Sequence, residues 1–211
     1  MLNKLDKDKR NNQTERAILL AAGKVFTRRG FAAARMDEIA KEAGINRALL
    51  HYYFRSKEKM FDIIFQEGMR EFFDGLVKII FSDIPLADKI RAIVEHDITM
   101  ISKNPDLPLF VMQEIGQRPE RLIAHAEKAG ARPGRLLKVF SKQVNEEIEK
   151  GHIRNIDPKQ LLINIMSLAI YPFIAKPMIM TMQELDQKGF DKIMNRRKTE
   201  VVEFILHALK P

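Results

Sequence analysis

The pattern of apolar positions between Arg35 and Lys57 predicts two short helices joined by a tight turn. Apolar residues on one helical face mark the first helix: Met36, Ile39, Ala40 and Ala43. Gly44 follows directly, where a helix end most often needs a residue that tolerates positive φ. Asn46 then stands at the N-cap of the second helix, because its side-chain oxygen can accept from a backbone N–H two or three residues further on.

The second predicted helix carries two different faces. Its apolar face consists of Leu49, Leu50, Tyr53 and Phe54. Its other face is small, basic and hydrogen-bonding, and consists of Arg47, Ala48, His51 and Tyr52. This is the layout of a helix-turn-helix, whose second helix enters the major groove with its N-terminal residues against base edges. An ordinary helical hairpin is the alternative interpretation, because a helix-glycine-helix sequence is common.

The rest of the chain has helical periodicity with short breaks and no convincing strand, which predicts an all-α protein. The expected helices span residues 12–29, 57–81, 86–103, 109–116, 119–129, 136–151, 158–182 and 190–210. Pro172 and Pro177 should kink or end the helix that contains them. We expect three segments: a flexible basic arm (1–11), an N-terminal three-helix bundle with the helix-turn-helix (12–60), and a larger helical domain for ligand binding and dimerisation (61–211).

Positive charge is concentrated in the first part of the chain. Residues 1–60 hold 14 lysines and arginines against 7 aspartates and glutamates, whereas residues 61–211 hold 22 against 21. The net charge of +8 over 211 residues therefore lies almost wholly on the segment with the helix-turn-helix. This segregation favours a polyanionic partner, and double-stranded DNA fits better than a membrane surface because the apolar faces are needed for the small core.

The segment from Thr14 to Met60 resembles the DNA-binding domain of the TetR/AcrR family of bacterial transcriptional regulators. The residues that carry the resemblance are Ala21-Ala22, Phe26, Gly30-Phe31, Ile39-Ala40, Ala43-Gly44-Ile45, Leu50, Tyr53-Phe54 and Ser56-Lys57-Glu58. The resemblance implies a regulator that binds a palindromic operator as a homodimer. It also implies a dimer interface built from the last two helices of each subunit. We therefore expect a repressor that is released from DNA by a small, mainly apolar effector.

Nine residues are candidates for DNA contact: Arg35, Met36, Asn46, Arg47, Ala48, Leu49, His51, Tyr52 and Lys57. Arg47 can reach a phosphate or a guanine. Leu49 stands where many family members have threonine, so it can contact a thymine methyl but cannot hydrogen-bond. Lys57 stands at the start of a long helix, where free backbone N–H groups make a natural phosphate site.

Two further sets of residues are candidates in the larger domain. The expected effector pocket is lined by Met69, Phe72, Phe73, Ile93, Asp97, Phe110, Glu114, Phe140 and Ile170. The expected dimer interface contains Leu161, Ile165, Leu168, Val201, Phe204 and Ile205. For Asp97 and Glu114 the alternative is an exposed helix edge, and for the last two helices it is a core within one subunit.

The sequence also argues against several classes of function. There are no cysteines, and no two of the five histidines lie three to five residues apart, so we expect no metal site and no cofactor. No catalytic spacing is visible, and we do not expect an enzyme. The charged N-terminus is unlike a secretory signal, and the longest apolar stretch is interrupted by prolines and polar residues, so we expect a cytoplasmic protein without a membrane span. A nonspecific nucleoid protein, and less favourably a helical lipid carrier or enzyme, remain alternatives.

Overall fold

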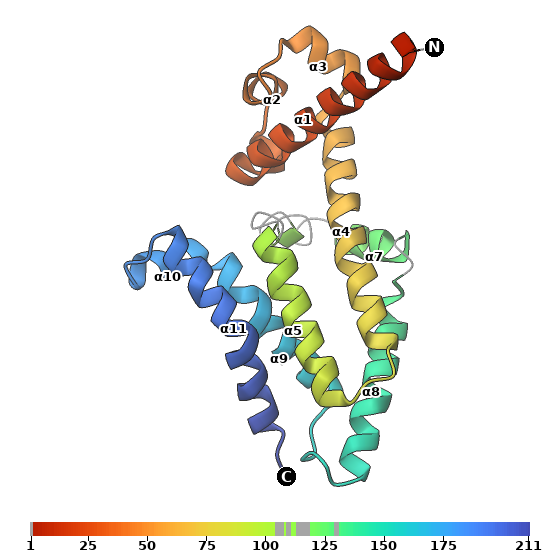
Figure 1. Ribbon diagram of the computed structural model, residues 1–211, viewed down its shortest axis with the longest axis vertical. Coiled ribbons are helices and arrows are strands. Elements are labelled where there is room, and N and C mark those ends of the chain that lie inside the picture. The colour runs from red at the N-terminus through yellow and green to blue at the C-terminus, as the bar shows by residue number, and fades with distance from the viewer. Residues whose placement is uncertain (1, 104–107, 109–110, 113–118, 129–130) are drawn as a thin grey trace. The chain divides into compact units, whose positions relative to one another are not determined.

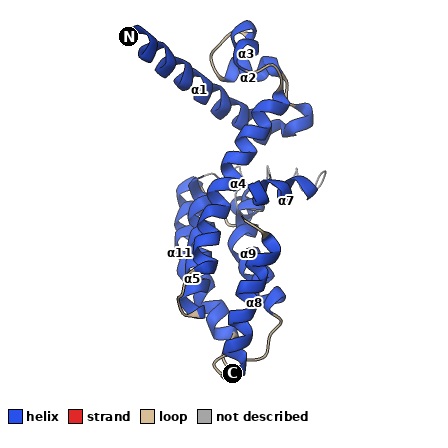
Figure 2. Cartoon of the chain, turned by 90° about the vertical axis from the view of Figure 1, so that its right-hand side faces the viewer, coloured by secondary structure: helices blue, strands red, loops and turns tan. Residues whose placement is uncertain are grey.

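The computed structural model describes residues 2–103, 108, 111–112, 119–128 and 131–211 (Figure 1). The described residues form helices without any strand, which confirms the all-α prediction (Figure 2). The helices are α1 (Leu2–Ala33), α2 (Met36–Glu42), α3 (Arg47–Tyr53), α4 (Lys57–Phe81), α5 (Leu86–Lys103), α7 (Pro119–Lys128), α8 (Pro133–Glu149), α9 (Pro158–Ile174), α10 (Lys176–Met182) and α11 (Gln187–Ala208).

The chain divides into two compact units. The first includes Met1–Gly68, and the second includes Met69–Pro108 and Arg118–Pro211. The division falls within α4, so the chain passes from one unit into the other inside a helix. Each unit has its own apolar core.

The first helix is longer than the pattern predicts. It begins at Leu2, so residues 2–11, expected to form a flexible arm, are helical. That expectation rested on their charge, but no glycine or proline occurs before Gly23, so nothing in the backbone interrupts the helix. The helix is broken at Gly30, which has φ +74° and ψ +157°.

The core of the first unit joins α1, α2, α3 and the start of α4. It contains Ile18, Ala22, Val25, Phe26, Ile39, Leu50, Phe54, Met60, Phe61 and Phe65, all at most 3% exposed. The aromatic rings pack with tilted and edge-to-face geometry, with centroids 5.6 Å apart for Phe26 and Phe61 and 4.6 Å apart for Phe31 and Phe61. The hydroxyl of Tyr53 donates to the side chain of Asn11 at 2.9 Å, so the early turns of α1 support the end of α3.

In the second unit, α5 is the central helix and packs against α9, α11 and α8 (Figure 2). Its buried face includes Ile90, Ile93, Val94, Ile98 and Ile101. These residues belong to one apolar cluster that also contains Phe140 of α8, Ile165 of α9 and Val202 of α11. Near the start of α5, the ammonium group of the buried Lys89 donates to the carbonyl of Ile80 at 2.9 Å. This bond gives a partner to a backbone carbonyl in the last turn of α4.

The single helix expected over residues 158–182 is broken into α9 and α10 at Ala175. Pro172 lies inside α9 and Pro177 in the first turn of α10, and the two helices are bent by 70° relative to one another. Within the described part of the chain, no single helix is long and apolar enough to cross a membrane. The bent pair α9 and α10 meets that length and composition test only when the two helices are taken together.

Candidate nucleic-acid interface

The turn between α2 and α3 is fixed by backbone and side-chain hydrogen bonds. Ile45 N donates to Ala40 O at 3.0 Å and Gly44 N to Lys41 O at 3.1 Å, the paired bonds of a Schellman C-cap. Gly44 has φ +67°, a conformation that a residue without a Cβ adopts at no steric cost. Asn46 Oδ1 then accepts from Leu49 N at 2.8 Å and caps α3. The predicted turn and N-cap are therefore confirmed.

The two sides of α3 differ sharply in burial. Leu50 is fully buried and Phe54, directly after the helix, is 1% exposed, so these residues attach α3 to the core. Tyr52 is 75% exposed and Leu49 38% exposed, and Arg47 and Ala48 also face solvent. The exposed set combines a cation, a methyl group, an isobutyl group and a phenol, which are groups able to contact phosphates and base edges.

Arg47 already has partners in the free protein. Its guanidinium lies 3.3 Å from a carboxylate oxygen of Asp37, and its Nε lies 3.5 Å from Nε2 of His51. Both side chains of the ion pair are mostly exposed, so the pair contributes little stability and can be exchanged for a phosphate or guanine at low cost.

Other ion pairs tie α2 to α1. Glu42 lies 3.3 Å from Arg28 and 3.9 Å from Lys24, and Glu38 lies 3.3 Å from Arg29. Glu38 also accepts from the backbone N–H of Arg35 at 3.4 Å. Arg35 is exposed at the N-cap of α2 and Met36 is half-buried in its first turn, so the Arg35 side chain remains accessible to a partner.

Lys57, which is predicted to contact DNA, has hydrogen-bond partners within the protein. Its ammonium group donates to three backbone carbonyls at the end of α1 and just after it, those of Phe31 (2.8 Å), Ala32 (3.0 Å) and Ala34 (3.1 Å). It also lies 4.8 Å from the centroid of the Phe31 ring. The three donors of a lysine are thus used within the protein. Position in the sequence could not reveal this, because the carbonyls come from a segment about 25 residues earlier.

The charges beside Lys57 were missing from the predicted set. Arg55 and Lys59 flank it and are exposed. Ser56 Oγ accepts from the backbone N–H of Lys59 at 3.4 Å, in the first turn of α4. An exposed helix N-terminus with two adjacent cations suits a phosphate group.

Comparison with known proteins places this surface in a family. Residues 18–64 match the family model described as bacterial regulatory proteins, tetR family. This segment is therefore similar to the DNA-binding domain of that family. Over 166 residues it is 26% identical to an uncharacterized HTH-type transcriptional regulator, YhgD of Bacillus subtilis, covering 74% of this chain and 80% of YhgD. The chain is accordingly a DNA-binding transcriptional regulator, as expected from its sequence.

Two solved structures share the fold of this protein. The ketosteroid transcriptional regulator KstR2 of Mycobacterium tuberculosis has a TM-score of 0.69 at 17% identity, covering 93% of this chain and 95% of KstR2. AibR, solved in complex with isovaleryl coenzyme A and operator DNA, has a TM-score of 0.64 at 18% identity, covering 90% of this chain and 97% of AibR. At these identities the likeness concerns the fold.

The residues predicted to line an effector pocket fall into three groups. Ile93 and Phe140 are fully buried in the core of the second unit, and Phe73 and Ile170 are partly buried against it. Met69 is buried and Phe72 is half-buried on α4, while Asp97 is 1% exposed on α5. Phe110 and Glu114 lie outside the described residues. An exposed helix edge, the alternative for Asp97, is therefore wrong.

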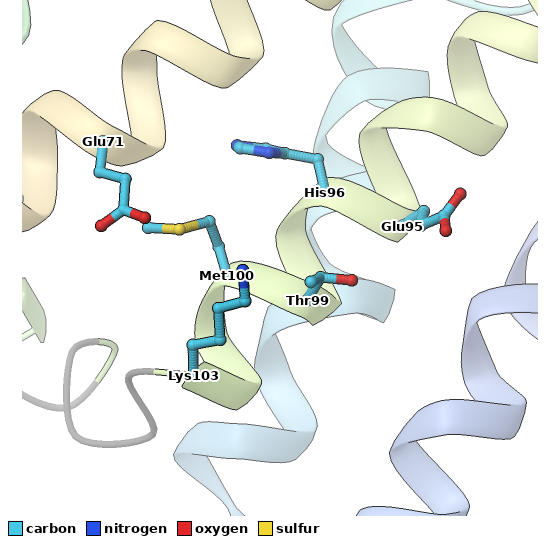
Figure 3. Close-up of a pocket in the computed structure, with 6 residues that line it drawn as sticks. All are labelled: Glu71, Glu95, His96, Thr99, Met100 and Lys103. Atoms are coloured by element: carbon cyan, nitrogen blue, oxygen red, sulfur yellow. The ribbon is translucent and has the colours of Figure 1, made fainter.

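An open cleft of about 350 Å³ lies elsewhere in the second unit, along α4 and α5. It is lined by Glu71, Glu95, His96, Thr99, Met100 and Lys103. Figure 3 shows His96 and Met100 pointing from α5 toward α4. His96 Nε2 lies 3.0 Å from the carbonyl oxygen of Phe72, and its ring fills the space beside Gly75, where a Cβ would come within 2.7 Å of Nδ1. The contact between α4 and α5 at this point therefore requires glycine at position 75.

Four of the six predicted dimer-interface residues are buried within one chain. Leu161, Ile165, Val201 and Ile205 are at most 4% exposed within a single chain, so they belong to the core of the subunit. Phe204 is 66% exposed and Leu168 is half-buried. Ile163 and Tyr171 on α9, absent from the predicted set, are 53% and 55% exposed. The apolar stripe on each helix is wide enough to include both inward and outward positions, and only the structure separates them.

Proposed function

We propose that this regulator is a repressor that binds a palindromic operator as a two-fold dimer and is released when a small, mainly apolar molecule binds in its second unit. The observation that carries the DNA-binding part is the burial contrast across α3. Leu50 fixes the helix, while Arg47, Ala48, Leu49 and Tyr52 lie on its exposed side. Their approach to base edges would follow the usual docking of a recognition helix in the major groove.

The residue types suggest which contacts carry sequence information. Leu49 offers only apolar contact, which suits a thymine methyl group. Arg47 can make bidentate contact with a guanine once its exposed pair with Asp37 is exchanged. Arg55 and Lys59 suit phosphate contacts that position the protein without reading sequence.

The dimer part of the proposal is supported by an unpartnered apolar set on adjacent helices. Ile163, Tyr171 and Phe204 are each more than half exposed, on α9 and α11, which pack against one another. Scattered single apolar residues are normal on a protein surface, but three large ones on two neighbouring helices suit a subunit interface. A two-fold dimer would present two recognition helices to half-sites about 34–36 Å apart.

Release by an effector is supported by the chain connection between the two units. α4 begins in the unit that carries α3 and continues into the unit with the large apolar core. A ligand can shift the DNA-binding equilibrium only through different affinities for the DNA-bound and free arrangements. AibR shows that a protein of this fold can be captured with both an acyl-coenzyme A and operator DNA.

Selection of bound fragments from a random DNA library tests the proposal directly. We expect a palindromic consensus, and we expect the Arg47→Ala variant to bind it about 5- to 150-fold more weakly if Arg47 contacts a base, which corresponds to about 1–3 kcal/mol. Lys138→Ala, which removes an equal charge from the exposed side of α8, is the matched control and should bind as the wild type does. Equal affinity for the selected and random DNA would instead favour a nonspecific architectural protein.

A further inference from the structure

Asp97 is a buried carboxylate of the second unit. It lies on the inward face of α5 and is 1% exposed. The residues that flank it on this face are Ile93, Val94, Ile98 and Ile101, all of them buried. Neither of its carboxyl oxygens has a hydrogen-bond partner in the described part of the chain.

Such a group is costly to a fold. A buried polar atom without a partner costs stability, and native proteins contain few of them. Burial raises the pKa of Asp97 to about 7, and desolvation is the cause of the shift, without a compensating cation. The described residues therefore place a carboxyl group in an apolar core and supply no hydrogen-bond partner for it.

Other buried or capping polar groups of this protein show the contrast. Lys89 is also buried, yet its ammonium group donates to the Ile80 carbonyl at 2.9 Å. Asp157 and Asp186 each accept from a backbone N–H at a helix start, at 2.9 and 2.7 Å. Asp97 lies in the middle of α5, where the backbone N–H groups are already used by the helix.

We propose that Asp97 anchors the effector through an N–H donor, and that the effector is an apolar molecule bearing an amine or amidine cation. This inference rests on the proposed function, because it assigns the chemistry of the effector that the proposal leaves open. An ammonium group supplies the hydrogen bonds that both carboxyl oxygens lack, and charge-assisted bonds are the strong ones at a desolvated site. An anionic ligand would instead bring a second negative charge beside an unpaired carboxylate. The aliphatic residues around Asp97 suit an apolar ligand body.

Matched small probes test this chemistry on the full-length protein. Hexylamine, hexanol and hexanoate share one chain length, and benzylamine, benzyl alcohol and benzoate form a second series. Binding is measured by isothermal titration calorimetry and by the shift in Tm at pH 8, above the raised pKa of Asp97. We expect the amine of at least one series to bind most tightly, the alcohol more weakly and the carboxylate least.

Substitutions at two neighbouring positions assign the preference to one site. Asp97→Asn should weaken amine binding about tenfold or more, and Asp97→Leu should remove the preference for the amine over the alcohol. Both variants should fold, because each removes an ionisable group that has no hydrogen-bond partner among the described residues. Glu95→Gln is the control, since Glu95 is exposed on the same helix and lines the open cleft.

The outcomes are decisive for Asp97. An amine preference that survives Glu95→Gln and disappears in both Asp97 variants supports the inference. The inference is overturned if the amine preference persists in Asp97→Leu, if the carboxylates bind best, or if no probe binds the wild type. Operator selection without probes is scored separately. A protein that selects a palindrome but prefers hexanoate overturns the Asp97 inference alone, whereas amine selectivity without operator selection overturns only the proposed function.

Discussion

Arg197 of α11 donates a hydrogen bond from its guanidinium to the backbone carbonyl of Leu168 on α9, at 2.8 Å. Leu168 is four residues before Pro172, and proline has no N–H to donate to that carbonyl. Arg197 therefore replaces the helix bond that the proline removes. This explains why α9 continues through Pro172 and ends only at Ile174.

Removing the Arg197 donor should destabilise the second unit, and the cost should depend on Pro172. Arg197→Met keeps an apolar stem and should lower the free energy of unfolding by about 1–3 kcal/mol, because the Leu168 carbonyl loses its partner. In a Pro172→Ala background the restored backbone N–H can bond that carbonyl, so the same substitution should cost less. Urea denaturation of the four proteins of this double-mutant cycle gives the coupling energy. Equal costs in both backgrounds would show that the two residues act independently, and Arg196→Met, on the exposed side of α11, is the control.

Substitutions of Lys57 and Lys59 should have different effects, because we expect Lys57 to stabilise the fold and Lys59 to contact DNA. Lys57→Met removes the ammonium group that donates to three backbone carbonyls at the end of α1 and just after it. The variant should therefore have a clearly lower Tm. Lys59→Met should leave the Tm nearly unchanged, reduce affinity uniformly across DNA sequences and lower the slope of log affinity against log salt by about one. Thermal unfolding and binding at several salt concentrations provide both readouts. A Lys57→Met variant with an unchanged Tm and a reduced salt dependence of DNA binding would show that Lys57 contacts DNA instead.

Some features of this fold and site could be predicted from the sequence, and others could not. The local signals were sufficient for the helix-turn-helix, because Gly44 and Asn46 act through bonds to residues three to five positions away. The pattern also gave the full extent of α4 and α5. The roles of Lys57 and Arg197 depend on carbonyls 23 to 29 residues away in the chain, which no periodicity encodes. The sequence could not separate inward from outward positions on α11 for a related reason, since the burial of Val201 and the exposure of Phe204 depend on which helices pack against α11.

Asp97 should give the stability of the protein a distinctive pH dependence. Its folded pKa of about 7 lies above the unfolded value of 3.8, so between these values the folded state holds a proton that the unfolded state has lost. The contribution of Asp97 to stability therefore falls as pH rises from about 4 to about 7, by on the order of 4 kcal/mol in total, and stays low above that range.

The measurement is the difference between wild type and Asp97→Asn in free energy of unfolding across pH 4 to 8. The free energy of unfolding of the variant should rise steadily relative to that of the wild type between pH 4 and pH 7. Above pH 7 the difference should stay constant. Other titratable groups such as Glu147, whose pKa is lowered by hydrogen bonds from Lys150 and His152, contribute equally to both proteins and cancel in the difference. A difference that does not change with pH would show that Asp97 ionises normally in the folded state.

The exposed apolar residues of α9 and α11 should control assembly. Phe204→Glu and Ile163→Glu place charges on residues that are 66% and 53% exposed, so each chain should still fold, while a dimer formed through this face should dissociate because the charge would be buried there unpaired. Val201→Glu should instead unfold the second unit, since Val201 is only 4% exposed within one chain.

Analytical ultracentrifugation gives the mass of the particle, and circular dichroism gives the Tm. The DNA affinity is measured for a full palindrome and, separately, for a single half-site. A folded monomer should lose the advantage that two linked recognition helices have on the full palindrome, which is about 10²- to 10⁴-fold for bivalent binding. Its affinity for one half-site should remain that of the wild type, because α3 is unchanged. Lys138→Glu is the control, because it changes the charge of an exposed residue on α8 and leaves α9 and α11 unchanged. This variant should remain dimeric. If Phe204→Glu and Ile163→Glu both remain dimeric and bind the full palindrome normally, subunits associate through a different surface.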